Sequence, residues 1–271
     1  MPGLFVYPTF LPPPVQAEVL NKLLHRDLSV PSHQTNVHLH YDISYSPELI
    51  SREGDASFFG PSASDLNHNS KTTPSSISTA QLLNKKLRWI TLGGQYDWSN
   101  KVYPPGAPPS FPADIKKLVE DAFPMKAEAA IVNIYSPGDT LSVHRDVSEA
   151  CAQPLVSISL GCDAIFFVAV EEVTATTSPP CADGQAQPIS AEYQSHTAAI
   201  RLRSGDAVLM SGTSRYAWHG VPKVLADTCP ECLRDWPAIG SEAENETYAA
   251  FRGWLKGKRV NLNVRQIFAS D

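Results

Sequence analysis

Seven residues near the C-terminus constrain the fold most, because polar and apolar side chains alternate strictly along them. The polar positions are Arg259, Asn261, Asn263 and Arg265, and the apolar positions are Val260, Leu262 and Val264. Such alternation is typical of a β-strand with two different faces. A polar face in solvent needs no partner, whereas a buried guanidinium needs an anion, because an unpaired buried charge is costly. An inward-facing strand therefore predicts a bound carboxylate, which guanidinium binds through two hydrogen bonds.

The second half of the chain favours β-structure, with short apolar or alternating runs separated by turn residues. The runs are 130–135, 155–160, 164–170, 200–202, 207–210 and 260–267. Helical spacing predicts one helix from Val15 to Leu28 behind three prolines, and a second over 115–123 behind Pro112. The predicted fold class is mainly β with flanking helices (α+β), as an antiparallel sandwich or barrel. Mobile or irregular loops are expected at 46–78, 174–196 and 223–245.

Composition gives expectations about the compartment. No apolar run reaches the roughly 18 residues that a membrane helix needs, and the first residues do not resemble a signal peptide. Five cysteines, an odd number, do not suggest a disulfide framework. We therefore expect an intracellular protein of the nucleus, cytoplasm or mitochondrion, without a choice among them. Cys229 and Cys232 could form half of a zinc site, but no second pair has a standard spacing, so unpaired thiols are predicted.

The net charge of −6, from 22 basic and 28 acidic residues, supplies no global attraction for nucleic acid. Any contact with phosphates must be local. The candidate basic patches are 85–88, 116–117 and 256–259.

A metal site is indicated by His144 and Asp146, because residues two apart on an extended segment point to the same side. His219 would complete a set of two histidines and one carboxylate, which leaves coordination positions open for substrate and oxygen. His38 and His40 have the same spacing but no matching carboxylate nearby, and we interpret them as a half-exposed strand face.

Five separated motifs in one order resemble the AlkB family of iron(II)- and 2-oxoglutarate-dependent dioxygenases. They are Asn133 to Gly138, His144-x-Asp146, Ser157 to Gly161, Ser211 to His219, and Arg259 to Arg265. Residues 87–93 and the long insert before the last strand are similar to the eukaryotic homologue 1 branch. The resemblance implies a double-stranded β-helix, or jelly roll, as one catalytic domain over 129–271. It further implies a nucleotide-recognition lid with a supporting helix over 81–128, and an N-terminal helical extension with a flexible loop over 1–80.

The resemblance assigns roles to individual residues. Iron would be bound by His144, Asp146 and His219, and 2-oxoglutarate by Asn133, Tyr135, Ser157, Arg259, Asn261 and Arg265. We expect Arg265 to hold the far carboxylate of 2-oxoglutarate and Arg259 to orient Asp146. Asn263 replaces the usual threonine of the last motif, which alters one hydrogen bond near the co-substrate.

The resemblance also implies a substrate-binding set of Trp89, Tyr96, Ser148, Glu149 and Arg215. Trp89 and Tyr96 match positions that face a flipped base, where an aromatic ring can stack on it. Core packing is the alternative for these two rings. Ser148 stands where bacterial relatives have an acidic residue, with Glu149 next to it, so the preferred base stays open.

The implied function is oxidative demethylation of an N-methylated base, with release of formaldehyde, succinate and carbon dioxide. N1-methyladenine in tRNA or other RNA and N6-methyladenine in DNA are both implied substrates. Partners would be methylated DNA or RNA, 2-oxoglutarate and oxygen, with no membrane; the oligomeric state is not predicted. Two alternatives stay open: hydroxylation or demethylation of a protein side chain, and a non-catalytic nucleic-acid-binding module of the same fold.

Overall fold

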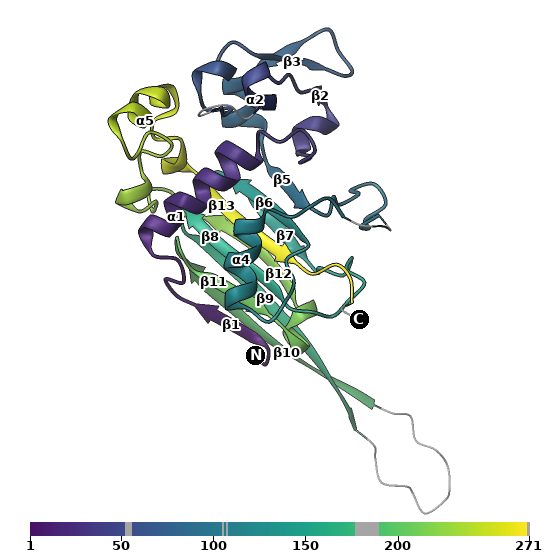
Figure 1. Cartoon of the computed structure of the whole chain (residues 1–271). Coiled ribbons are helices and arrows are strands. Elements are labelled where there is room, and N and C mark those ends of the chain that lie inside the picture. The colour runs from purple at the N-terminus through teal and green to yellow at the C-terminus, as the bar shows by residue number, and fades with distance from the viewer. Residues whose placement is uncertain (52–55, 105, 107, 177–189, 270–271) are drawn as a thin grey trace, which may run out of the picture.

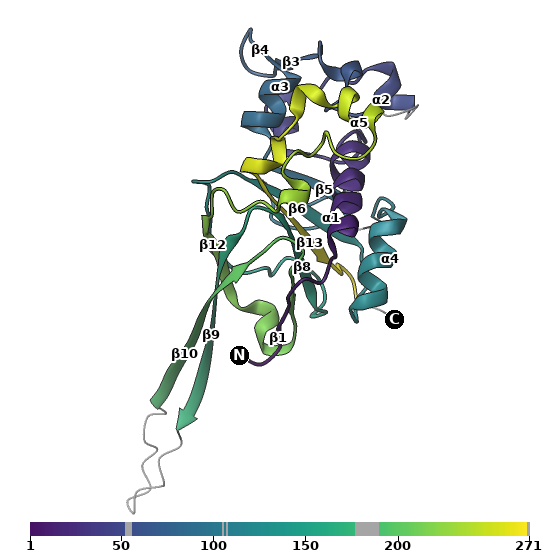
Figure 2. The ribbon, with the colours of Figure 1, turned by 90° about the vertical axis from the view of Figure 1, so that its left-hand side faces the viewer.

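The computed structural model describes residues 1–51, 56–104, 106, 108–176 and 190–269. Its centre is a pair of antiparallel sheets that face each other (Figures 1 and 2). The six-stranded sheet has the order β1 (Leu4–Tyr7), β11 (Ala207–Met210), β8 (Leu155–Gly161), β13 (Arg259–Arg265), β6 (Ala129–Tyr135) and β5 (Trp89–Gly93). The four-stranded sheet has the order β10 (Ser190–Leu202), β9 (Ala164–Thr176), β12 (Trp218–Val224) and β7 (Leu141–His144). The predicted jelly-roll architecture is confirmed.

Strand β13 occupies the centre of the six-stranded sheet, between β8 and β6. Its three apolar side chains are fully buried in the main core. The same core receives α1 (Pro13–Leu20), its π-helical continuation Asn21–Asp27, and α4 (Ala113–Ala122), which cross the outer face of the sheet (Figure 2). The polar face of β13 therefore points inward, toward the four-stranded sheet.

A glycine sets the entry into β13. Gly161 at the end of β8 has φ +80°, and a Cβ there would lie 2.4 Å from the carbonyl oxygen of Lys258. Only a residue without a side chain allows this close approach. The approach aligns Gly161 with Arg259 across the ladder, so the first arginine of β13 starts opposite the last residue of β8.

Most of the predicted elements are confirmed, but the loop predictions need correction. Segment 46–78 contains α2 (Pro47–Ser51), a 3₁₀ turn Pro61–Ala63, β3 (Asn67–Ser70) and β4 (Ser76–Ser78), which with β2 (Tyr41–Asp42) form a small sheet. Residues 174–176 and 190–196 are paired strand rather than loop, because β9 and β10 form a long hairpin that extends from the body (Figure 1). Residues 177–189 of that prediction lie outside the described residues.

The segment 223–245 is largely irregular, as expected, but it is packed. Trp236 has no exposed surface and contacts the rings of Phe59 and Trp254. The remaining short elements are 3₁₀ turns Asn36–Leu39, Gly212–Tyr216, Glu231–Leu233, Ala249–Phe251 and Trp254–Gly257, helices α3 (Thr79–Gln81) and α5 (Glu242–Thr247), and a π-helical turn Leu82–Lys86. No helix among the described residues is long and apolar enough to cross a membrane.

Candidate active site

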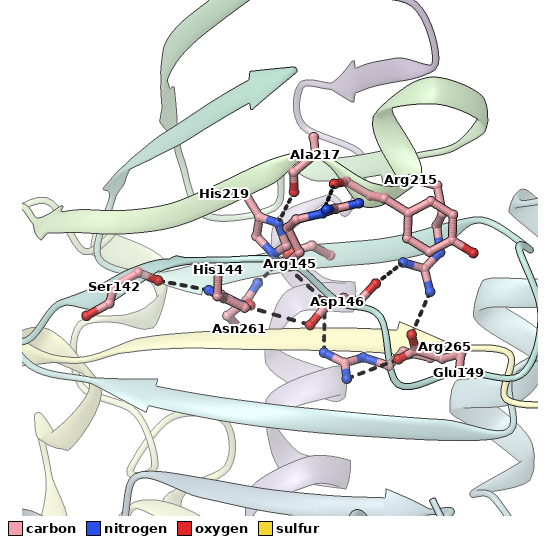
Figure 3. Close-up of polar contacts among 12 residues, drawn as sticks. Ser142, His144, Arg145, Asp146, Glu149, Arg215, Ala217, His219, Asn261 and Arg265 are labelled. Carbon is pink, nitrogen blue, oxygen red and sulfur yellow. Dashed lines mark hydrogen bonds and ion pairs between the residues drawn. The ribbon is translucent and has the colours of Figure 1, made fainter. Parts of the chain in front are cut away.

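Two histidines and one carboxylate meet at one side of the four-stranded sheet, where its edge strand β7 pairs with β12. His144 ends β7 and is paired with His219 on β12, and Asp146 follows two residues after His144. Each residue offers one ligand atom within 4.8 Å of the others. Both Nδ1 atoms point away from this centre, His144 at 2.8 Å from the carbonyl oxygen of Ser142 and His219 at 3.0 Å from that of Ala217 (Figure 3). A carbonyl only accepts, so each Nδ1 donates and each Nε2 keeps its lone pair for a metal.

The donor set fits iron(II). Two imidazoles and one carboxylate on one face leave coordination positions open, which is the ligand arrangement of non-haem iron oxygenases. Burial lowers the pKa of His219, which keeps its ring in the neutral form that binds metal. Among the described residues, no other group of three histidine, cysteine or acidic side chains converges in this way.

Asp146 is held from behind by a buried chain of charges. Arg265 donates to its Oδ2 at 3.0 Å, and Arg215 donates to its backbone carbonyl at 3.0 Å. Glu149 links the two arginines, at 2.9 Å from Arg215 and 3.3 Å from Arg265. Burial alone would raise the pKa of Asp146, but Arg265 and the two histidines outweigh it and lower that pKa. The prediction that Arg259 orients Asp146 is wrong, because Arg265 makes this contact.

Arg259 is buried and short of partners. Its side chain is 1% exposed, its Nη2 donates to Ser159 Oγ at 3.0 Å, and its guanidinium lies 5.5 Å from the centre of the Tyr135 ring. Its Nε and Nη1 have no hydrogen-bond partner among the described residues. Burial lowers the pKa of Arg259, as expected for a cation without a counter-ion. An anion such as a carboxylate would supply the hydrogen-bond acceptor that these N–H groups lack.

One cavity joins the unpaired arginine to the metal ligands. Its volume is about 210 Å³. The polar residues around it include Asn133, Ser157, Asn261, Asn263, Arg259 and Arg265, together with all three proposed iron ligands. Asn261 Nδ2 donates to Ser157 Oγ at 2.7 Å, and Asn263 Oδ1 has no partner among the described residues. The lining therefore fits a small dicarboxylate such as 2-oxoglutarate. We predicted that Arg265 holds its far carboxylate, but Arg265 is paired with Asp146 and Glu149, whereas Arg259 has nitrogens without a partner among the described residues.

Aromatic side chains stand at the lid side of the cavity. Tyr96 and Trp98 line it, and Tyr96 Oη lies 3.2 Å from Ser148 Oγ. Trp89 is stacked on Trp98, with ring centres 4.7 Å apart, and does not itself line the cavity. Sequence reasoning missed Trp98. The available signal was a tryptophan two residues after Tyr96, in a segment whose apolar residues show no periodic spacing. A large aromatic residue in such a segment can face a ligand rather than the core.

The other predicted substrate contacts lie elsewhere. Glu149 and Arg215 are each 1% exposed in their side chains and do not line the cavity, so they support Asp146 rather than face the opening. The basic patch 256–259 is not a surface patch, because Lys258 is 7% exposed and Arg259 is buried.

The structure also bears on the interpretations of His38 and of the two neighbouring cysteines. His38 lies in a 3₁₀ turn rather than on a strand, where its Nδ1 accepts from the backbone of Thr35 at 3.0 Å. Cys229 and Cys232 are free thiols, and neither belongs to a metal-binding group among the described residues.

Residues 3–265 match the model of the 2OG-Fe(II) oxygenase superfamily, whose members use iron(II) and 2-oxoglutarate. The N6-methyladenosine RNA demethylase ALKB1 of Pyricularia oryzae is 46% identical, over 98% of this chain and 75% of that protein. The tRNA demethylase abh1 of Schizosaccharomyces pombe is 36% identical, over 98% of this chain and 79% of that protein. The solved structure of OsALKBH1 superposes with a TM-score of 0.52 at 18% identity, covering 98% of this chain and 97% of that one, which shows a shared fold. The chain therefore belongs to the 2OG-Fe(II) oxygenase superfamily and, within it, to the homologue 1 branch of the AlkB family.

Proposed function

We propose that this protein is an oxidative demethylase of N-methylated adenine in RNA. One observation carries the proposal: the three proposed metal ligands and the unpaired guanidinium of Arg259 share a cavity whose entrance is lined by aromatic rings. The two relatives described above, which cover nearly the whole chain, are named as RNA and tRNA demethylases. Methylated adenine in DNA is the competing substrate of the same chemistry.

The size of the cavity supports a division of the site. Pockets that enclose a whole drug-sized ligand have volumes of roughly 300 Å³ or more. A cavity of about 210 Å³ suits the co-substrate and a methyl group, with the base itself at the entrance. Tyr96 and Trp98 stand there and offer faces on which an unpaired base can stack.

The protein's contribution to the reaction is positioning. When bound, iron(II) would supply the oxidation of the N-methyl group, with O2 as the oxidant and 2-oxoglutarate as the electron donor that leaves as succinate and carbon dioxide; the hydroxymethyl product then releases formaldehyde. Arg259 binds and orients the co-substrate, while Arg265, Arg215 and Glu149 hold Asp146 in place. Apolar side chains of the cavity, Leu155, Phe166, Met210 and Val221 among them, exclude water from the reacting methyl group.

The test is release of formaldehyde and succinate with iron(II), ascorbate and 2-oxoglutarate. Substrates are single-stranded RNA and DNA of one sequence, carrying N1-methyladenine or N6-methyladenine, and a methylated peptide. Equal formaldehyde and succinate from a methylated RNA, abolished by His144→Ala, supports the proposal and identifies the base. Formaldehyde from the peptide alone, or succinate without formaldehyde from any substrate, would refute it.

A further inference from the structure

An exposed cation and an exposed indole lie together beside the metal ligands. Trp218, the first residue of β12, is 41% exposed, and the guanidinium carbon of Arg145 is 5.7 Å from its ring centre. Val143 and Val147, which flank the first iron ligands, are 52% and 59% exposed. Together these four residues form an apolar surface with one cation, which we call the rim patch. Arg145 is the member of this patch that lines the cavity. Exposed apolar side chains next to such a cavity are typical of a binding surface.

The guanidinium of Arg145 is held in place but not neutralised. Its Nε donates to the carbonyl oxygen of Tyr216 at 2.8 Å, which holds the group within 5.7 Å of the centre of the Trp218 ring. No carboxylate among the described residues is within ion-pairing distance of it. Its two terminal nitrogens therefore remain available to an anion. A planar cation stacked on an aromatic ring is a common way to bind a phosphate next to a base.

The rim patch stands apart from the aromatic rings of the lid. Trp98, 40% exposed, and Tyr96 line the cavity from the loop that follows β5. Arg145 directly follows β7, and Trp218 begins β12 of the four-stranded sheet. A base whose methyl group reaches the metal stacks on the lid rings. The nucleotide next to it in the strand then has to leave over the cavity's entrance, where Arg145 lines the wall.

We propose that the rim patch binds the nucleotide adjacent to the methylated base in an unpaired strand of RNA, Trp218 stacking on its base and Arg145 contacting its phosphate. This inference rests on the proposed function, because it assumes a nucleic-acid substrate. It explains how a chain with a net charge of −6 can bind RNA: the contacts are few, local and partly apolar, so binding does not need a basic surface.

The experiment measures binding separately from turnover. Fluorescence anisotropy gives the Kd of a labelled, unmethylated single-stranded RNA at several salt concentrations. We expect Trp218→Ala to raise Kd about tenfold, the size typical of one lost stacking contact. Arg145→Ala should raise Kd and lower the slope of log K against log salt by about 0.7, the value for one phosphate on a single strand. Arg145→Lys should restore that slope without restoring the full affinity, since lysine keeps the charge but not the plane.

Lys223→Ala is the matched control, an exposed cation on the same strand β12, four residues beyond His219. It should leave Kd and slope unchanged. The visible absorption band of the iron(II) and 2-oxoglutarate complex reports that each variant is folded with an intact cavity. If the wild-type protein does not bind the RNA, if the rim variants bind like wild type, or if Lys223→Ala has the same effect as Arg145→Ala, the inference is wrong. If the rim variants weaken RNA binding but the wild-type protein releases no formaldehyde from RNA, the proposed function fails and the RNA-binding rim patch stands.

Discussion

The two arginines of β13 predict opposite outcomes for the same substitution. Arg265 is paired with two buried carboxylates of the protein, whereas two nitrogens of Arg259 have no partner among the described residues. Methionine has a similar length and no charge, so it removes the guanidinium with little change in packing. Arg265→Met should make the ligand-free protein less stable than wild type. Arg259→Met should leave the ligand-free protein as stable as wild type or more stable, but remove its response to 2-oxoglutarate.

The magnitudes follow from burial. Removing one partner of a buried ion pair costs about 3 to 5 kcal/mol. The substitution Arg265→Met removes the cationic partner of both Asp146 and Glu149. At 2 to 4 °C per kcal/mol for a chain of this size, the melting temperature of Arg265→Met should fall by about 10 °C. For Arg259 the sign reverses, because a buried charge without a counter-ion is unfavourable to begin with. Saturating ligand, at 100 times its Kd, stabilises a protein by about 2.7 kcal/mol, and this gain should vanish in Arg259→Met.

Differential scanning calorimetry of the metal-free proteins, then of the same proteins with Mn(II) and 2-oxoglutarate, measures both effects without turnover. Mn(II) accepts nitrogen and oxygen ligands and replaces iron to avoid oxidation during the scan. If Arg259→Met melts well below wild type without ligand, or still gains stability from 2-oxoglutarate, the assignment of the two arginines is wrong. The same conclusion holds if Arg265→Met melts like wild type.

Three further predictions concern the lid, the metal and pH. Trp98→Ala should raise the KM for a methylated oligonucleotide about tenfold while the KM for 2-oxoglutarate stays the same, and an equal rise in both would exclude a base contact. Chelation should abolish formaldehyde and succinate together, with recovery on adding iron(II) in wild type but not in His144→Ala. Burial lowers the pKa of His25 and His68 to about 4, so the unfolded chain binds more protons between pH 6.5 and 4. The free energy of unfolding should therefore decrease as the pH is lowered from 6.5 to 4, by up to about 3 kcal/mol for each histidine. In urea titrations at several pH values, His25→Phe should remove roughly half of the decrease that these two histidines cause.

Alternation along β13 was enough to predict a strand with one polar and one apolar face, since periodicity of two is a local property, but whether the polar face points inward depends on tertiary packing. It could not say which arginine lies behind Asp146. That depends on the register of β13 with β6 and β8, and on the path of the chain after His144, both of which are tertiary. The motif order predicted which residues gather at the site, but their individual contacts had to come from the structure.

The segment 223–245 shows a different limit. Its apolar residues follow no helical or strand period, so it was expected to be loop, and it is largely irregular in the structure. Yet Trp236 is fully buried there, between aromatic residues from distant parts of the chain. A single large ring can anchor an irregular segment, and a search for periodic patterns does not detect this. The loop after β5 was difficult to predict for the same reason. Trp98 is held there by its stacking contact with the ring of Trp89, which no periodic pattern indicates.

The division of roles along β13 also bears on how the co-substrate is oriented. Arg259 and Arg265 are six residues apart, about 20 Å along a strand, and only Arg265 reaches the ligand Asp146. Because the charge of Arg265 is already paired with two protein carboxylates, the unpaired charge of this face is that of Arg259. A dicarboxylate entering the cavity therefore finds one attractive end at Arg259 and the other at the metal, so its orientation is set before any substrate binds. Since the proposed co-substrate site lies between Arg259 and the metal ligands, we expect the methylated base to approach from the part of the cavity lined by Tyr96 and Trp98.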